Sequence, residues 1–273
     1  MKSKSIVTLL LLAALSGCAS TASFQLVRNH APIDRAFVTN VTVDQFESAS
    51  FTSARGTRLV YRVLRPSNVD AGKRYPLVVQ LHGSGGIGTD NVAQLDAMAK
   101  SWATPEMRSR YQTFVLVPQF PIRSANYGPA SPEQFAVPSS ALDDAQELIA
   151  SFASNNAVDT SRIYATGFSM GGSASWLLPQ RSPNTLAAIV PISGIAPSNA
   201  DASHYLDLPI LAMHGNADSE NPITADKRFI KAITQLGGVK PTLYEYQGLG
   251  HMPPADAYPG YWWRDWLFKQ QRQ

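Results

Sequence analysis

Short apolar runs recur along this chain and alternate with longer stretches in which apolar residues return every three to four positions. The short runs predict strands, and the longer amphipathic stretches predict helices. The predicted strands cover residues 57–64, 75–81, 113–117, 162–166, 187–192, 208–213 and 242–246. The predicted helices cover residues 140–153, 170–180, 225–236 and 258–269. This alternation predicts an α/β fold with a mostly parallel sheet and helices on both faces.

The N-terminal segment has the pattern of an export signal. Lys2 and Lys4 precede an apolar run over residues 6–15, which is too short to span a bilayer and is typical of a signal-peptide core. Residues 15–18, Leu-Ser-Gly-Cys, resemble a bacterial lipobox, in which the cysteine is acylated and begins the mature protein. Cys18 is the single cysteine of the chain, so no internal disulfide can form. We therefore expect residues 1–18 to be a lipoprotein signal peptide with its lipobox.

The rest of the chain divides into a tether and one domain. Residues 19–40 are polar and unperiodic and predict a flexible tether, whereas residues 41–273 are long enough for one sizeable core. The resemblance to a lipobox followed by Ala19 favours the outer membrane of a Gram-negative cell. Loss of the signal segment removes two lysines and lowers the net charge from +3 to about +1, which excludes a basic nucleic-acid surface.

One predicted strand and one predicted helix meet at a serine flanked by glycines. The strand over 162–166 leads into Gly167-Phe168-Ser169-Met170-Gly171, and the helix follows. This is the layout of a nucleophile elbow, where glycines remove Cβ atoms that would clash in a sharp turn. The helix N-terminus favours negative charge developing near Ser169. A Gly/Ser-rich turn is the alternative interpretation of the motif.

A serine nucleophile needs a histidine base and an acid, which follow it in the chain order serine, acid, histidine. Of the five histidines, His30 and His82 precede the serine and break this order. His204 and His214 follow the serine without a comparable acid between, and His214 is expected to be a structural residue hydrogen-bonded near a strand end. His251 lies in a Gly/Pro-rich loop after the last predicted strand and is the predicted base.

The acid is expected on the loop after the strand over 208–213. This loop begins His-Gly-Asn-Ala-Asp at residues 214–218, and Asp218 is the predicted acid. Glu220, two residues further on, stays open as the alternative. Asp201 and Asp207 precede the strand and would lie at its opposite end.

The same fold requires two backbone N–H groups for an oxyanion hole. One is expected from Met170, directly after the serine, and the other from the loop after the strand over 75–81. That loop reads His-Gly-Ser-Gly-Gly, and its glycines let the backbone approach a substrate carbonyl. We expect the Ser84 N–H to be the second donor, with Gly85 as the alternative. The loop contains neither a dinucleotide nor a P-loop pattern.

The longest irregular stretch covers residues 119–139 and is rich in proline. Loops of this length are usually functional or disordered. We expect it to form a wall of the substrate pocket, which would be lined by Phe120, Tyr127, Trp176 and Met252. In the alternative interpretation, the aromatic residues of the loop only pack it against the domain.

Four motifs together resemble the α/β-hydrolase superfamily: L-H-G-S-G-G at 81–86, G-F-S-M-G-G at 167–172, H-G-N-A-D at 214–218 and G-H-M at 250–252. More narrowly, residues 55–270 resemble bacterial secreted esterases related to dienelactone hydrolase, polyhydroxybutyrate depolymerase and feruloyl or acetyl-xylan esterases. The resemblance implies an α/β-hydrolase fold without a large cap domain. It also implies a triad of Ser169, Asp218 and His251 and an oxyanion hole formed by the Ser84 and Met170 amides.

These features predict a serine carboxylesterase that is lipid-anchored to the cell envelope. Its substrates would be short-chain or aryl carboxylic esters, either small molecules or linked to carbohydrate, and the mechanism needs neither a metal nor a cofactor. A serine peptidase of the prolyl-oligopeptidase type is one alternative, but the chain leaves no room for the usual propeller domain. A non-catalytic envelope binding protein on a hydrolase scaffold is another, and it would require the loss of a triad position.

Overall fold

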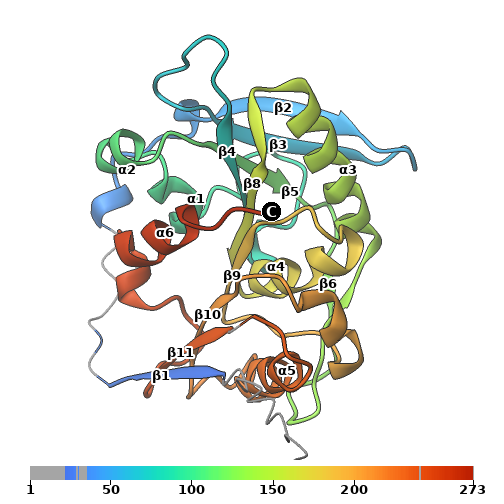
Figure 1. Ribbon diagram of the computed structural model, residues 1–273. Coiled ribbons are helices and arrows are strands. Elements are labelled where there is room, and N and C mark those ends of the chain that lie inside the picture. The colour runs from blue at the N-terminus through green and yellow to red at the C-terminus, as the bar shows by residue number, and fades with distance from the viewer. Residues whose placement is uncertain (1–21, 29, 31–35, 240, 273) are drawn as a thin grey trace, which may run out of the picture.

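The computed structural model describes residues 22–28, 30, 36–239 and 241–272, so Cys18 and the signal segment lie outside the described residues. A nine-stranded sheet forms the centre, with strand order β1-β11-β10-β9-β8-β4-β5-β3-β2 (Figure 1). Its strands are β1 (Ser23–Val27), β2 (Glu47–Thr52), β3 (Arg58–Leu64), β4 (Tyr75–Leu81), β5 (Phe114–Gln119), β8 (Val158–Phe168), β9 (Ala188–Ile192), β10 (Leu211–Gly215) and β11 (Thr242–Tyr246). In this order, each neighbouring pair of strands from β1 to β5 is parallel. β3 pairs antiparallel with both β5 and β2.

Helices cover both faces of this sheet. They are α1 (Ala97–Ser101), α2 (Pro105–Arg110), α3 (Ser140–Asn155), α4 (Met170–Arg181), α5 (Thr224–Gln235) and α6 (Tyr261–Phe268). Buried residues of α3, α4 and α5 belong to one core cluster, and those of α1, α2 and α6 belong to a second cluster on the other face (Figure 1). The predicted α/β class, with a mostly parallel sheet between two layers of helices, is therefore confirmed.

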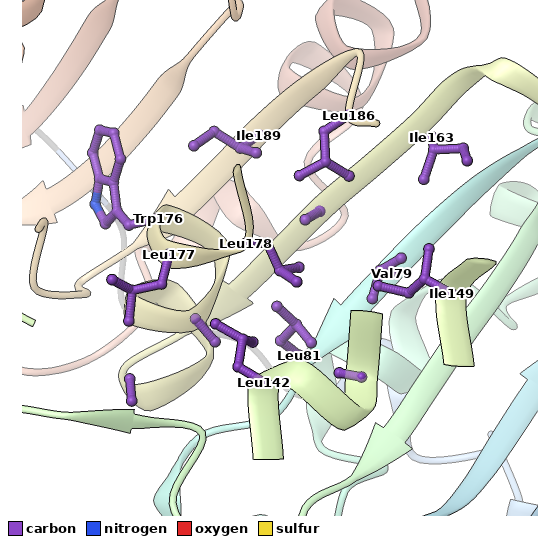
Figure 2. Packing of buried hydrophobic residues seen from close by; sticks show 14 of the residues in the cluster. Val79, Leu81, Leu142, Ile149, Ile163, Trp176, Leu177, Leu178, Leu186 and Ile189 are labelled. Atoms are coloured by element: carbon purple, nitrogen blue, oxygen red, sulfur yellow. The ribbon is translucent and has the colours of Figure 1, made fainter. Parts of the chain in front are cut away.

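The central strand β4 shows why a continuous apolar run forms a strand here. All seven of its residues are buried, because helices pack on both sides of it. Leu77, Val79 and Leu81 point into the cluster with α3 and α4, and Val78 points into the opposite cluster. Figure 2 shows Leu81 near Leu142 and Val79 beside Ile149 within the first cluster. Burial of each such side chain contributes about 1.5–3 kcal/mol before entropic costs.

Each predicted strand and helix is present, with boundaries that differ by a few residues. The edge strands β1 and β2 were not predicted. Residues 23–27 lie within the predicted tether, but they pair with β11 in parallel register from Ser23 opposite Thr242 to Val27 opposite Tyr246. The tether prediction is therefore wrong for this strand. The reason is that no residue of β1 is fully buried, so the strand lacks the continuous apolar run of a buried strand.

No helix within the described part of the chain has the length and apolar character needed to cross a bilayer.

The two-stranded ribbon of β6 (Ala125–Asn126) and β7 (Val137–Pro138) lies within the long irregular stretch. Both of its strands contact α4, so the ribbon lies on the same face as α3 and α4. Backbone carbonyls of Pro132 and Gln134 also accept hydrogen bonds from Arg228 of α5, at 2.6 and 2.8 Å. The stretch is therefore tied to two helices of one layer.

Candidate active site

Ser169 occupies the sharp turn between β8 and α4. Its backbone has φ 59° and ψ −119°, a conformation that costs an ordinary residue on the order of 1–3 kcal/mol. The Ser169 N–H donates to the Ile192 carbonyl at 3.0 Å, which holds the turn against the end of β9. A Cβ on Gly167 or Gly171 would overlap the Leu81 carbonyl oxygen. The two glycines therefore let the turn pack directly against the end of β4.

Three side chains from separate loops form a hydrogen-bonded chain at the carboxyl edge of the sheet. The His251 Nε2 lies 2.8 Å from the Ser169 Oγ, and the His251 Nδ1 lies 2.7 Å from the Asp218 Oδ2. Asp218 follows β10, and His251 follows β11, the neighbouring parallel strand. Parallel strands end at the same edge of a sheet, which brings residues far apart in sequence together.

The contacts of Asp218 define the tautomer of His251. The Asp218 Oδ1 accepts the backbone N–H groups of Glu220 and Asn221, at 3.0 and 2.8 Å. Burial alone would raise the pKa of Asp218, but hydrogen bonds from His214, His251 and the Asn221 N–H hold that pKa well below its usual range. The ionised Oδ2 therefore accepts the Nδ1–H of His251, which leaves the Nε2 lone pair facing the Ser169 hydroxyl.

Glu220 lies on the other side of the same imidazole. Its Oε2 is 3.8 Å from the His251 Nε2, which is the nitrogen that faces Ser169, and its side chain is 71% exposed. Asp218 is fully buried beside the Nδ1. The geometry therefore favours Asp218 over Glu220 as the residue that orients His251.

The predicted oxyanion donors both begin helical turns. Met170 is the first residue of α4, and Ser84 is the first residue of the 3₁₀-helix η3 (Ser84–Gly86). N–H groups at these positions have no acceptor inside their own helix. A Cβ on Gly83, directly before η3, would lie 3.7 Å from the Ser169 Cβ, so the loop packs against the nucleophile turn. Gly85, the alternative donor, is the next residue of η3.

His82 holds the glycine-rich loop in place. Its Nδ1–H donates to the Gly83 carbonyl at 2.7 Å, and its Nε2 accepts the Phe120 N–H at 3.0 Å. Burial lowers the pKa of His82 to about 4, so the ring is neutral and can accept at Nε2. Chain order excludes His82 as the base, but sequence alone does not show this positioning role.

The four predicted pocket residues lie in different environments. Phe120 and Trp176 are fully buried in the core, where they contact His82 and Phe229 respectively, so neither forms an open pocket wall. Their prediction as lining residues is wrong because large aromatic side chains near a site also serve as packing. Met252, next to His251, is 45% exposed. Tyr127 lies half-buried under the Arg123 guanidinium, 4.9 Å from its ring centroid.

Tyr127 also lines a cavity of about 600 Å³ within the long irregular stretch, together with Pro129, Phe135 and Val137. Phe135 and Val137 are 47% and 44% exposed, so apolar surface is present at this cavity. Ser169 is not among its lining residues. The stretch thus forms a hollow of its own, separate from the hydrogen-bonded chain.

Residues 69–257 match the family model described as Phospholipase/Carboxylesterase. This match covers more than half of the 273 residues. The chain belongs to the phospholipase/carboxylesterase family. The resemblance to α/β-hydrolase esterases is thereby confirmed, and so is the predicted fold.

Curated relatives of this phospholipase/carboxylesterase family member include a protein of Salmonella typhimurium assigned as a carboxymethylenebutenolidase. The two are 29% identical over 133 residues, which cover 46% of this chain and 49% of the relative. A protein of Aspergillus niger assigned as feruloyl esterase C is 26% identical over 185 residues, covering 68% of this chain and 64% of the relative. The chain thus spans about half the length of the first of these relatives and less than two thirds of the second.

The phospholipase/carboxylesterase family member is also similar to the crystal structure of a thermostable esterase. The TM-score is 0.74 with 30% sequence identity, and the match covers 84% of this chain and 64% of the other. The similarity therefore extends over most of the described sheet and helices.

Proposed function

We propose that this protein is a serine carboxylesterase that hydrolyses short-chain or aryl carboxylic esters through an acyl-enzyme. The observation that carries the proposal is the chain of hydrogen bonds from Ser169 through His251 to Asp218, at 2.8 and 2.7 Å. Each bond has the length expected for a nucleophile, its base and the orienting acid. Esterase relatives and a similar esterase structure support the same reaction class.

The geometry supports a two-step reaction. The Ser169 Oγ attacks the ester carbonyl while the His251 Nε2 takes the serine proton, and the tetrahedral intermediate collapses as His251 returns that proton to the leaving alcohol. Water then attacks the acyl-enzyme with His251 again as base, which releases the acid and restores Ser169. Asp218 stabilises the imidazolium in both steps and does not itself take up the proton.

Hydrolysis of p-nitrophenyl acetate, butyrate and octanoate tests this proposal. We expect turnover that declines with acyl length, and stoichiometric inactivation by a fluorophosphonate, with the added mass located on the peptide containing Ser169. A folded protein that neither hydrolyses these esters nor reacts with the fluorophosphonate would contradict the proposal. Labelling of Ser169 without hydrolysis would support Ser169 as the nucleophile but contradict the proposed ester substrates.

The oxyanion hole can be tested by deleting one N–H group. Ser84→Pro removes the proposed donor, and proline is compatible with a first helical position after the extended Gly83, whose ψ is 175°. We expect kcat to fall by about 10² to 10³ with little change in KM. Ser84→Ala keeps the N–H and is the matched control, expected within a few-fold of wild type. Equal activities of Ser84→Pro and Ser84→Ala would contradict the Ser84 N–H as the donor and favour the Gly85 N–H instead.

We also propose that the protein is an envelope lipoprotein acylated at Cys18. The support is the apolar run over residues 6–15 and the single cysteine three residues beyond it. In cells fed an alkynyl fatty acid, we expect label on the wild-type protein and none on Cys18→Ser, with the variant moving from the membrane to the soluble exported fraction. Label that persists in Cys18→Ser would contradict acylation at this site.

A further inference from the structure

A second histidine is buried beside Asp218. His214 lies within β10 with no exposed side-chain surface. Its Nδ1 is 2.9 Å from the Asp226 Oδ2, and its Nε2 is 2.7 Å from the Asn221 carbonyl oxygen and 3.4 Å from the Asp218 Oδ2. The Asp218 Oδ2 therefore lies between two imidazoles, with His251 on its other side at 2.7 Å.

The partners of His214 require more hydrogens than a neutral ring carries. The Asn221 carbonyl can only accept, so the Nε2 must be protonated. The Nδ1 faces a carboxylate oxygen of Asp226. Burial raises the pKa of the Asp226 carboxyl, but the charge and the hydrogen bond of His214 oppose this rise, and an ionised Asp226 requires a hydrogen on the Nδ1 as well. Burial lowers the pKa of His214, but the charge of Asp226 and the hydrogen bonds to Asp218, Asp226 and Asn221 outweigh it and raise the pKa to about 9.

The other charged groups near the His214 ring lie on β11 and α5. Glu245 is the register partner of His214 on β11, and its Oε2 is 2.6 Å from the Lys227 Nζ of α5. Asp226 lies in the first turn of α5 and is itself fully buried. Among the described residues, the ion pairs of the His214 ring are those with Asp226 and Asp218.

The bonds of His214 also close the loop that carries Asp218. The Asn221 carbonyl accepts from the His214 Nε2, and the Asn221 N–H donates to the Asp218 Oδ1 at 2.8 Å. The Asn221 side-chain amide donates to the Ser193 carbonyl at 2.8 Å, which ties the loop to the end of β9. Thus His214 and Asn221 together determine where the Asp218 carboxylate lies.

We propose that His214 is a positioning residue in its doubly protonated form, held by Asp226, that fixes the Asp218 loop and keeps the Asp218 carboxylate ready to orient His251. The inference rests on the proposed function for its kinetic consequence. The protonation state of the ring itself is independent of turnover. The two parts can therefore be tested separately.

The first experiment is long-range ¹H–¹⁵N spectroscopy of the protein labelled with ¹⁵N-histidine. We expect one of the five rings to keep both nitrogens protonated at pH 8, and the signal of that ring to be missing in His214→Gln. In Asp226→Asn, which removes the carboxylate but keeps its shape, the same ring should carry a single hydrogen at pH 8. A neutral His214 ring in the wild-type protein would overturn the inference, whether or not the protein hydrolyses esters.

The second experiment compares the kinetics of His214→Gln with those of His204→Gln, in which an exposed histidine is replaced. We expect His214→Gln to lower kcat about 10- to 100-fold with KM nearly unchanged, because Asp218 is no longer fixed. Loss of the positive ring removes a like charge from the site, so the acid limb of the kcat/KM profile should move to higher pH by about one unit. A merely structural residue would lower activity equally at all pH values, and that result would reject the positioning role.

Discussion

Replacing Ser169 with alanine is expected to lower kcat for p-nitrophenyl butyrate by about six orders of magnitude. The substitution removes the Oγ that lies 2.8 Å from the His251 Nε2, and within the described part of the chain no other hydroxyl hydrogen-bonds to this nitrogen. The backbone bond from the Ser169 N–H to the Ile192 carbonyl does not depend on the side chain, so the turn should persist. Steady-state kinetics with a burst-phase control for trace wild-type enzyme provide the measurement.

The fold of this variant must be intact for the comparison to count. We expect its melting temperature to stay within a few degrees of wild type, since alanine faces the same positive φ as serine at this position. Ser154→Ala, at an exposed serine of α3, is a control for serine replacement in general. Turnover within 100-fold of wild type in a folded Ser169→Ala variant would contradict the assignment of the nucleophile.

Replacing Asp218 with asparagine is expected to lower kcat by about 10⁴. The Oδ1 of the wild-type carboxylate accepts two backbone N–H groups, from Glu220 and Asn221, so the amide oxygen of asparagine must take that position. The amide NH₂ then faces the His251 Nδ1 and can only donate to it. His251 is thereby forced into the tautomer with hydrogen on Nε2, which cannot accept the serine proton.

Glu220→Gln is the matched control for this substitution. It removes a carboxylate of the same loop that lies 3.8 Å from the imidazole but is exposed to solvent. We expect its kcat within a few-fold of wild type, because an exposed charge is strongly screened. A larger loss in Glu220→Gln than in Asp218→Asn would reassign the acid.

The sequence predicts the interior of this fold better than its edges. The apolar run at β4 is recognisable because both faces of the strand are buried. β1 (Ser-Phe-Gln-Leu-Val) is short and has no buried position, and β2 carries polar residues at four of its six positions, so neither has the continuous apolar run of an interior strand. Their pairing depends on the free edges of the assembled sheet. The start of β8 also differs from its prediction, because residues 159–162 are polar and only Val158 of this first half pairs with β4, at Tyr75.

The candidate site is likewise only partly predictable from the sequence. The order of residues along the chain and the positions of the strand ends can be read from the sequence, and they suffice to select Ser169, Asp218 and His251 as a group. The roles of His82 and His214 depend on hydrogen bonds to Phe120 and Asp226, which are 38 and 12 residues away. The spacing of four residues from His214 to Asp218 within H-G-N-A-D is the signal that points to their contact.

The direction of β1 has a consequence for the acylation proposed at Cys18. Because β1 runs parallel to β11, Ser23 lies at the amino edge of the sheet, opposite the edge where the loops of Asp218 and His251 begin. Cys18 is five residues before Ser23, a distance of about 18 Å at full extension. An acyl chain on Cys18 would hold the amino edge toward the bilayer and turn the opposite edge outward. Ser169 would then meet esters from the aqueous side rather than lipids of the leaflet that holds the anchor.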